Sequence, residues 1–132
     1  MLAKFYSDPS YNHFHCVENE YVILENAQGE IVDKQRWDGD KYRQVRYKPI
    51  DNVYSGLVRP RNSQQCLAFD LMQDSKTSVK LLSGSFGSGK TMIMILHALE
   101  AIRRGDVDKL VWVRNNVEVK DSVPLGALPG LG

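Results

Sequence analysis

The chain has 132 residues, and its 17 Lys and Arg residues against 16 Asp and Glu residues give a net charge of +1. This length indicates one domain or part of one, and the balanced charge excludes a protein that binds polyanions over its whole surface. A hydrophobic content of 42% is typical of a folded globular chain. No apolar run is long enough to cross a membrane, no signal peptide is evident, and the two cysteines indicate neither a disulfide framework nor a zinc module. We therefore expect a cytoplasmic protein.

The first part of the chain, residues 1–58, carries the signals of short strands. Residues 1–18 show no hydrophobic period, so we expect an irregular segment there. Three segments that we interpret as strands follow, separated by turn residues: the apolar, partly β-branched run Tyr21–Leu24, then Ile31–Trp37 and Tyr42–Tyr47. These runs predict a small antiparallel β-meander.

The second part, residues 59–132, begins within a connector over residues 48–61 that contains Pro and Gly. Asn62 is a good N-cap, and Gln65 stands three residues later, which suits reciprocal capping of a helix start. Apolar residues at helical spacing follow, so we expect a helix that ends near Gln73.

Strands and helices alternate in the rest of the chain. Val79–Leu82 and Leu110–Val113 are short apolar runs that we interpret as buried strands. Between them, Lys90–Arg104 has the length and composition of a helix, with Gly105 as a natural residue after its end. This order predicts a parallel α/β sheet, followed by a loop over residues 115–132.

The segment between the first of these strands and the long helix carries the clearest chemical motif. Its residues match the pattern G-x-x-x-x-G-K-[ST] at every fixed position: Gly84, Ser85, Phe86, Gly87, Ser88, Gly89, Lys90 and Thr91. Glycines let backbone N–H groups curve around a phosphate, and a helix N-terminus adds positive potential. Lys90 supplies a charge for the β- and γ-phosphates, and the Thr91 hydroxyl suits Mg²⁺. We interpret these eight residues as nucleotide-binding and Thr91 also as metal-binding; a glycine-rich turn with an incidental lysine is the alternative.

Further motifs flank this loop in a fixed order. They are Arg59-Pro60-Arg61-Asn62 with Gln65 before it, and Val111-Trp112-Val113-Arg114 and Leu125-Gly126-Ala127-Leu128-Pro129-Gly130 after it. Together with the loop, they resemble the PhoH-like family of P-loop ATPases, over roughly residues 19–132. The resemblance implies an α/β fold, namely a P-loop NTPase three-layer α/β/α sandwich that is truncated in this sequence and preceded by the β-meander. It also implies ATP and Mg²⁺ as cofactors.

The resemblance implies roles for individual residues. Gln65 matches the family glutamine that reads the adenine edge, where an amide can pair with N6 and N7, although helix capping explains the same residue. Arg114 would lie near bound nucleotide or nucleic acid, or be an ordinary surface arginine. Asn115 and Ala127 stand where the family usually has Pro and Phe. The implied activity is ATP hydrolysis coupled to RNA unwinding or translocation, in a ring-shaped homo-oligomer.

Hydrolysis also requires an acidic residue, the Walker B acid, that orients Mg²⁺ and the attacking water. The family places it beyond the Leu-Pro-Gly loop, and this sequence reaches Gly132 without it. Glu25 and Asp70 each follow an apolar run, but they fall on an expected meander strand and an expected helix and are poor substitutes. We therefore expect this chain to bind ATP, and whether it hydrolyses ATP alone stays open. Because the later strands of the family sheet are not in this sequence, we also expect an incomplete sheet and a protein of low stability. One branch of the family carries a nuclease-like domain before the core, and we do not expect that domain within these 132 residues, because too few of them precede the core.

A different class of function is suggested by residues 34–61, which hold eight basic and three acidic residues. Four aromatic residues are interleaved with them: Trp37, Tyr42, Tyr47 and Tyr54. Because basic grooves with aromatic platforms bind single strands, the alternative function is a non-catalytic RNA- or partner-binding module. A solvated sheet face with its aromatic residues packed beneath explains the same pattern. A small-molecule kinase is disfavoured, since 83 residues precede Gly84, and His13, His15 and Cys16 lack the further ligands of a metal site.

Overall fold

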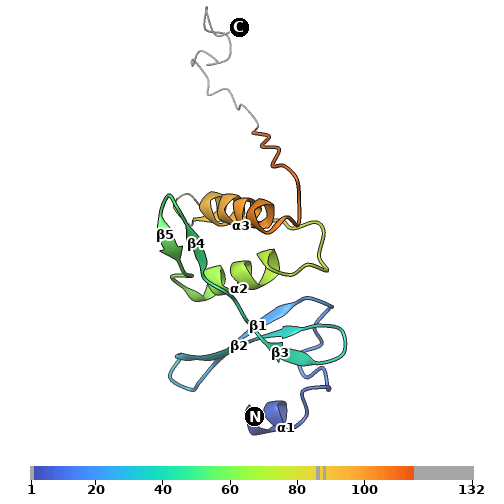
Figure 1. The fold of residues 1–132 in the computed structure, drawn as a ribbon. Helices are drawn as coiled ribbons and strands as arrows, with labels where there is room; N and C mark the ends of the chain where they lie inside the picture. The colour runs from blue at the N-terminus through green and yellow to red at the C-terminus, as the bar shows by residue number, and fades with distance from the viewer. Residues whose placement is uncertain (1, 86, 88, 115–132) are drawn as a thin grey trace, which may run out of the picture.

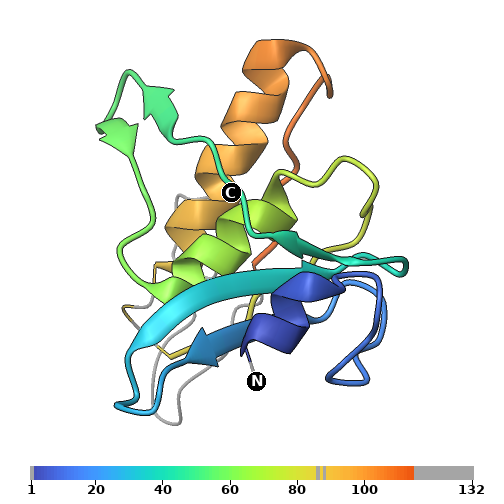
Figure 2. The ribbon, with the colours of Figure 1, turned by 90° about the horizontal axis from the view of Figure 1, so that it is seen from below.

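The computed structural model describes residues 2–85, 87 and 89–114. Its elements in chain order are α1 (Leu2–Ser7), β1 (Tyr21–Glu25), β2 (Ile31–Trp37), β3 (Tyr42–Gln44), β4 (Ile50–Asn52), β5 (Gly56–Val58), α2 (Ser63–Met72) and α3 (Lys90–Arg104). Figure 1 shows α2 between α3 and the sheet of β1, β2 and β3, with α1 on the far side of that sheet. The turned view in Figure 2 shows the same order of layers, with the β4–β5 hairpin beside the two long helices.

The three-stranded sheet is the β-meander that the sequence predicts, except that its third strand ends at Gln44 rather than at Tyr47. Its strand order is β1-β2-β3, with antiparallel neighbours throughout. Tyr21 lies opposite Arg36, and Trp37 lies opposite Tyr42. The turn between β1 and β2 is closed by the side chain of Asn26, whose Oδ1 accepts hydrogen bonds from the N–H groups of Gln28 and Glu30.

The N-terminal segment is not wholly irregular, and in this the sequence prediction was wrong. Leu2–Ser7 forms α1, and the Phe5 ring packs 4.8 Å from the Tyr42 ring, measured between centroids. Phe5 is buried in a first hydrophobic core with Cys16, Leu24, Trp37 and Tyr42. A six-residue helix is unstable alone, so this packing against the sheet is what stabilises it.

Part of the expected connector over residues 48–61 is a second small sheet, which the sequence analysis missed. Strands β4 and β5 pair antiparallel, with Ile50 opposite Val58. The Oδ1 atom of Asn52 accepts hydrogen bonds from the N–H groups of Tyr54 and Ser55, and this closes the turn. The hairpin packs on α3 because Ile50 enters the second hydrophobic core.

Both expected helices are present. The Oδ1 atom of Asn62 accepts a hydrogen bond of 2.9 Å from the Gln65 N–H and caps α2, which ends at Met72 with Gln73 as its C-cap. Helix α3 ends at Arg104, and the φ of 81° at its C-cap residue Gly105 lies in the left-handed region that a non-glycine residue rarely adopts. The second core lies between the two helices and the hairpin and contains Ile50, Phe69, Ile93 and Leu96. No helix in the described residues has both the length and the apolar character needed to cross a membrane.

The two strands expected around the long helix are not formed, which corrects the sequence prediction. Val79 and Leu81 are each 88% exposed, and Val111 and Val113 are 69% and 81% exposed. A strand is stable only when its backbone groups pair with a neighbour, and within the described residues neither segment lies beside one. The fold is therefore a mixed α/β structure with two small antiparallel sheets, and the three-layer sandwich is not seen in the described part.

The meander and α2 are joined through one buried carboxylate. Asp70 is 5% exposed, and its Oδ2 atom accepts hydrogen bonds from the Tyr21 hydroxyl at 2.6 Å and from Arg36 Nη1 at 3.1 Å. Arg43 binds both carboxylate oxygens at 3.0 and 3.1 Å, and the backbone N–H of Arg46 reaches Oδ1 at 3.0 Å. This arrangement holds the sheet against the helix with charge-assisted hydrogen bonds.

These contacts change the proton affinity of the carboxylates. Burial alone would raise the pKa of Asp70, but hydrogen bonds from Arg43, Tyr21 and the Arg46 N–H outweigh it and hold the pKa below its usual value. The pKa of Asp74 is also lowered, because hydrogen bonds from Arg36 and Thr77 outweigh burial. Since both carboxyls bind protons more weakly in the folded state, they stabilise it above about pH 4, and this contribution is lost as the pH falls further.

We predict that Asp70→Ala lowers the free energy of unfolding by about 3–5 kcal/mol, because it leaves the buried Arg36 guanidinium without one of its charge partners. Urea unfolding followed by circular dichroism measures this change. Glu100→Ala is the control, since it removes only the i,i+3 ion pair with the exposed Arg103 and should cost less than about 1 kcal/mol. Equal losses for the two variants would show that Asp70 makes no special contribution.

Candidate nucleotide-binding site

The loop with the G-x-x-x-x-G-K-[ST] pattern leads directly into α3. Phe86 and Ser88 lie outside the described residues, whereas the other six positions of the loop are described. Gly87 and Gly89 have φ values of 78° and 82°, in the left-handed region that glycine adopts without strain. The carbonyl of Gly89 accepts the first hydrogen bond of α3, from the Ile93 N–H at 3.0 Å. The glycines therefore turn the chain sharply at the start of the helix.

The ammonium group of Lys90 lies over the loop. Its Nζ atom donates hydrogen bonds to the carbonyl oxygens of Gly84 at 2.5 Å and Ser85 at 3.2 Å. A positive charge is thus held inside the curve of the glycine-rich segment, where the motif requires one.

The first turn of α3 presents polar groups of its own. Gly89 is the N-cap of the helix and has no side chain with which to cap it. The helix N-terminus therefore provides backbone N–H groups and the positive end of the helix dipole. Thr91 is exposed in this turn, so its hydroxyl is accessible to a ligand at the loop.

Gln65 lies beside the loop and also takes part in capping α2. Its Oε1 atom accepts a hydrogen bond of 2.8 Å from the Arg61 N–H. Its Nε2 atom lies against Gly89, where a Cβ atom added to that glycine would come within 3.1 Å of it. The structure thus brings Gln65 and the loop together, although Gln65 and Gly89 are 24 positions apart in the chain.

A pocket of about 280 Å³ lies between α2 and the start of α3. It is lined by Asn62, Gln64, Gln65, Ala68, Leu82, Ser83, Lys90 and Ile93. Sequence reasoning missed five of these lining residues, namely Gln64, Ala68, Leu82, Ser83 and Ile93. The signal that could have identified four of them is proximity: Gln64 and Ala68 share α2 with Gln65, and Leu82 and Ser83 directly precede the glycine-rich loop.

None of the described residues that line this pocket is acidic. Glu25 is exposed on β1, in the meander. Asp70 faces the meander and is occupied by Arg36 and Arg43. Neither acid is therefore placed to orient a water molecule at the loop.

Among the described residues, Arg114, His13, His15 and Cys16, which the sequence also singled out, do not line this pocket. Arg114 is exposed, and Asn115 and the Leu125–Gly130 loop are outside the described residues. Cys16 is buried in the first core, and the His13 ring packs 5.7 Å from the Phe5 ring. The described residues contain no group of His, Cys, Asp and Glu side chains that could hold a metal ion by themselves.

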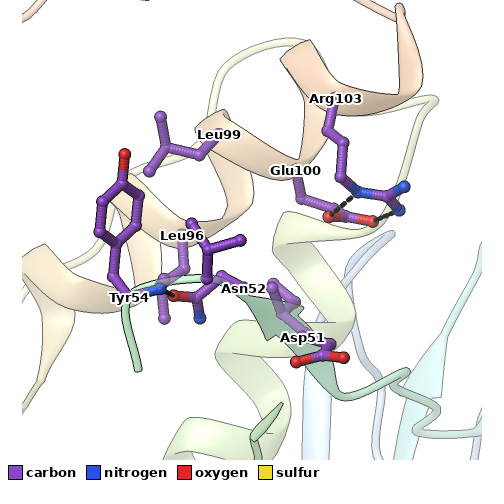
Figure 3. Close-up of a pocket in the computed structure, with 9 residues that line it drawn as sticks. Asp51, Asn52, Tyr54, Leu96, Leu99, Glu100 and Arg103 are labelled. Carbon is purple, nitrogen blue, oxygen red and sulfur yellow. Dashed lines mark hydrogen bonds and ion pairs between the residues drawn. The ribbon is translucent and has the colours of Figure 1, made fainter. Parts of the chain in front are cut away.

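A second cavity, of about 410 Å³, lies between the β4–β5 hairpin and the C-terminal half of α3. Figure 3 shows the Tyr54 ring and the side chains of Leu96 and Leu99 at one end, and the ion pair between Glu100 and Arg103 at the other. This cavity shares no lining residue with the pocket beside the glycine-rich loop, so the two are distinct.

A glycine-rich loop that opens a helix, with a lysine at its end, is typical of proteins that bind nucleotide phosphates. The family model described as PhoH-like protein matches residues 57–131, more than half of the chain, and the chain belongs to this family. Membership indicates a nucleotide-binding module related to ATPases. Neither the curated proteins nor the solved structures gave a match.

We predict that Gly89→Ala destabilises the protein more than Gly29→Ala. Both residues have φ near 80°, so alanine is strained by about 1–2 kcal/mol at either position. Only at Gly89 would the added Cβ also press on Gln65 Nε2, since no atom lies within 4 Å of a Cβ at Gly29. Thermal unfolding of the two variants measures the difference, and equal destabilisation would contradict the packing of Gln65 against the loop.

Proposed function

We propose that this chain binds ATP with Mg²⁺ through the loop of residues 84–91. The observation that carries the proposal is that Gln65, Lys90 and the start of α3 meet in one pocket beside the glycine-rich turn. This supports a site with a phosphate-binding end and a base-binding end, which is more than a glycine-rich turn would require.

The phosphates would be bound mainly by charge and by backbone donors. The loop glycines and the N-terminus of α3 provide N–H groups and positive potential. The Lys90 ammonium, which contacts the carbonyls of Gly84 and Ser85, would turn from them to the β- and γ-phosphates of the nucleotide. The sequence pattern assigns four further residues to the phosphate-binding loop in this proposal, namely Ser85, Phe86, Gly87 and Ser88.

The residues present fit Mg²⁺ in the way that phosphate-loop proteins use it. Mg²⁺ keeps several waters and takes one or two protein oxygens together with substrate phosphates. Thr91, exposed in the first turn of α3, is the residue that would hold it. When bound, the ion neutralises phosphate charge.

Gln65 is proposed to contact the adenine. Its Nε2 atom lies beside Gly89, and its Oε1 atom accepts from the Arg61 N–H, so an amide donor and an amide acceptor both lie at the side of the loop. An amide held in this way can pair with the N6 and N7 edge of adenine. Selectivity for ATP over GTP is the property that a purely capping role would not produce.

The wider role is proposed from the family. As part of a PhoH-like ATPase, residues 59–132 would belong to the ATPase domain and residues 1–58 to the segment before it. ATP hydrolysis coupled to RNA unwinding or translocation, in a ring-shaped homo-oligomer, is the proposed activity of the complete domain. Hydrolysis needs an acid that the described pocket lining does not supply. The free thiols of Cys16 and Cys66 support a reducing compartment such as the cytoplasm.

We predict that Mg-ATP raises the melting temperature of the wild-type chain but not of Lys90→Ala. At a ligand concentration of about 100 times Kd, binding adds roughly 2.7 kcal/mol of stability. Lys109→Ala is the control, because it removes an exposed lysine outside the site and should keep the full shift. A shift that is the same in wild type and Lys90→Ala, or no shift in wild type, would contradict the proposed site.

A further inference from the structure

An open groove of about 690 Å³ lies on the opposite end of α2 from the nucleotide pocket. One wall is the segment that follows β3, and the other is the C-terminal end of α2 with the turn after it. The side chains that matter for its chemistry are Arg43, Arg46, Tyr47, Lys48, Gln73 and Lys76. Four of these six are cationic.

The backbone of the first wall is fixed to the helix. The Arg46 N–H donates to Asp70 Oδ1 at 3.0 Å. The Lys48 N–H donates to Gln73 Oε1, and Gln73 Nε2 donates to the Lys48 carbonyl, both at 2.8 Å. These bonds hold the residues on either side of Tyr47 in place, so the groove is built before any ligand arrives.

The charge in the groove is not balanced. Asp70 is bound by Arg36 and Arg43, and Asp74 by Arg36. Among the described residues, none of Arg46, Lys48 and Lys76 takes part in an ion pair. Because the acids are already compensated, these three cations leave a local positive field despite the net charge of +1 for the whole chain.

An aromatic ring lies among these cations. The Tyr47 ring meets the buried Phe69 edge to face, with ring centroids 6.0 Å apart and an angle of 80° between the planes. Tyr47 is nevertheless 39% exposed, so part of it remains open to a stacking partner. Cations along a groove with an accessible ring are the pattern that binds single strands, through phosphate contacts and base stacking.

The structure also separates this groove from the rest of the basic segment. Arg36, Trp37 and Tyr42 are buried, at 2%, 8% and 4% exposure, and they belong to the interior of the protein. The interpretation as a sheet face with its aromatic residues packed beneath thus holds for Trp37 and Tyr42, whereas Arg36 is buried rather than solvated. It does not hold for Arg46, Tyr47 and Lys48, and Lys76 joins them from a part of the sequence that had not been singled out.

From this arrangement we infer that the groove binds single-stranded nucleic acid, with phosphates on Arg46, Lys48 and Lys76 and a base on Tyr47. The inference goes beyond nucleotide binding at the loop and does not depend on it, since no residue is shared by the two pockets.

The test is binding of a fluorescent 12-nucleotide oligouridine to the full chain, followed by anisotropy at several salt concentrations. Arg46→Glu/Lys48→Glu should weaken binding at least about tenfold. It should also reduce the slope of log K against log salt by about 1.4, or about 0.7 for each lost phosphate contact. Arg43 is left intact, because its reversal would also break the ion pair with Asp70.

The matched control is Lys4→Glu/Lys109→Glu, which makes the same change of charge at exposed lysines outside the groove and should keep most of the affinity. Tyr47→Leu keeps an apolar contact for Phe69 and should lose about fivefold or more through stacking alone. Lys90→Ala should bind the oligouridine as the wild type does. A failure of RNA binding at the groove can therefore be distinguished from a failure of ATP binding at the loop. Any of four results would overturn the inference. Two concern the wild type, namely no binding of the oligouridine, or equal affinity for a polyglutamate peptide. The other two are equal weakening of binding by the two charge-reversal variants and no effect of Tyr47→Leu.

Discussion

The carboxylate of Asp70 is the constraint on which the rest of the structure depends. It is buried near the end of α2 and binds two arginines, a tyrosine hydroxyl and a backbone N–H that all come from the meander or the segment after it. A buried charge is tolerated only when it is paired and hydrogen-bonded. The position of α2 relative to the sheet is therefore tied to this cluster, which lies between the two separate apolar cores.

Helix α2 connects the two cores because neighbouring residues on it face different layers. Asp70 faces the meander, while Phe69, 1% exposed, packs in the second core, where its ring meets that of His97 on α3 at 4.8 Å. His97 is itself buried; its Nδ1 lies 2.7 Å from the Ile93 carbonyl, and burial lowers its pKa, so the ring is neutral at pH 7. A displacement of α2 would disturb both layers at once.

Both proposed sites are positioned by this one helix. Its first turn carries Gln65 against Gly89 and so forms one side of the phosphate-loop pocket. Its C-cap residue, Gln73, clamps the backbone of Lys48 and forms one side of the basic groove. A nucleotide at one end and a nucleic-acid strand at the other would contact the same rigid element, although they share no residue.

Local signals in the sequence were sufficient for the features that depend on near neighbours. The meander, the Asn62 cap and the end of α3 before Gly105 could all be predicted, because turn residues and caps act within a few positions of themselves. Helix α1 could not be predicted in this way, because it is stabilised by the packing of Phe5 on Tyr42, which is far away in the chain.

Features that need distant partners were missed or predicted wrongly. Val79–Leu82 and Leu110–Val113 have the composition of strands, but composition does not supply a neighbouring strand. Similarly, nothing in the pattern around Asp70 reveals that Arg36 and Arg43 reach it across 34 and 27 residues. For the site, the loop could be read from its spacing, whereas the contact between Gln65 and Gly89 needed the packing of two helices.

The most direct test of the role of Asp70 is native-state hydrogen exchange of the free protein, comparing the amides of β2 with those of α2. If Asp70 joins the meander and the helices into one cooperative unit, the slowest amides of both elements should open with the same free energy. In Asp70→Asn, the opening free energies of the two elements should differ, with the amides of α2 opening at a lower free energy than those of β2. Protection of β2 that already differs from that of α2 in the wild type, and is unchanged in Asp70→Asn, would contradict this role.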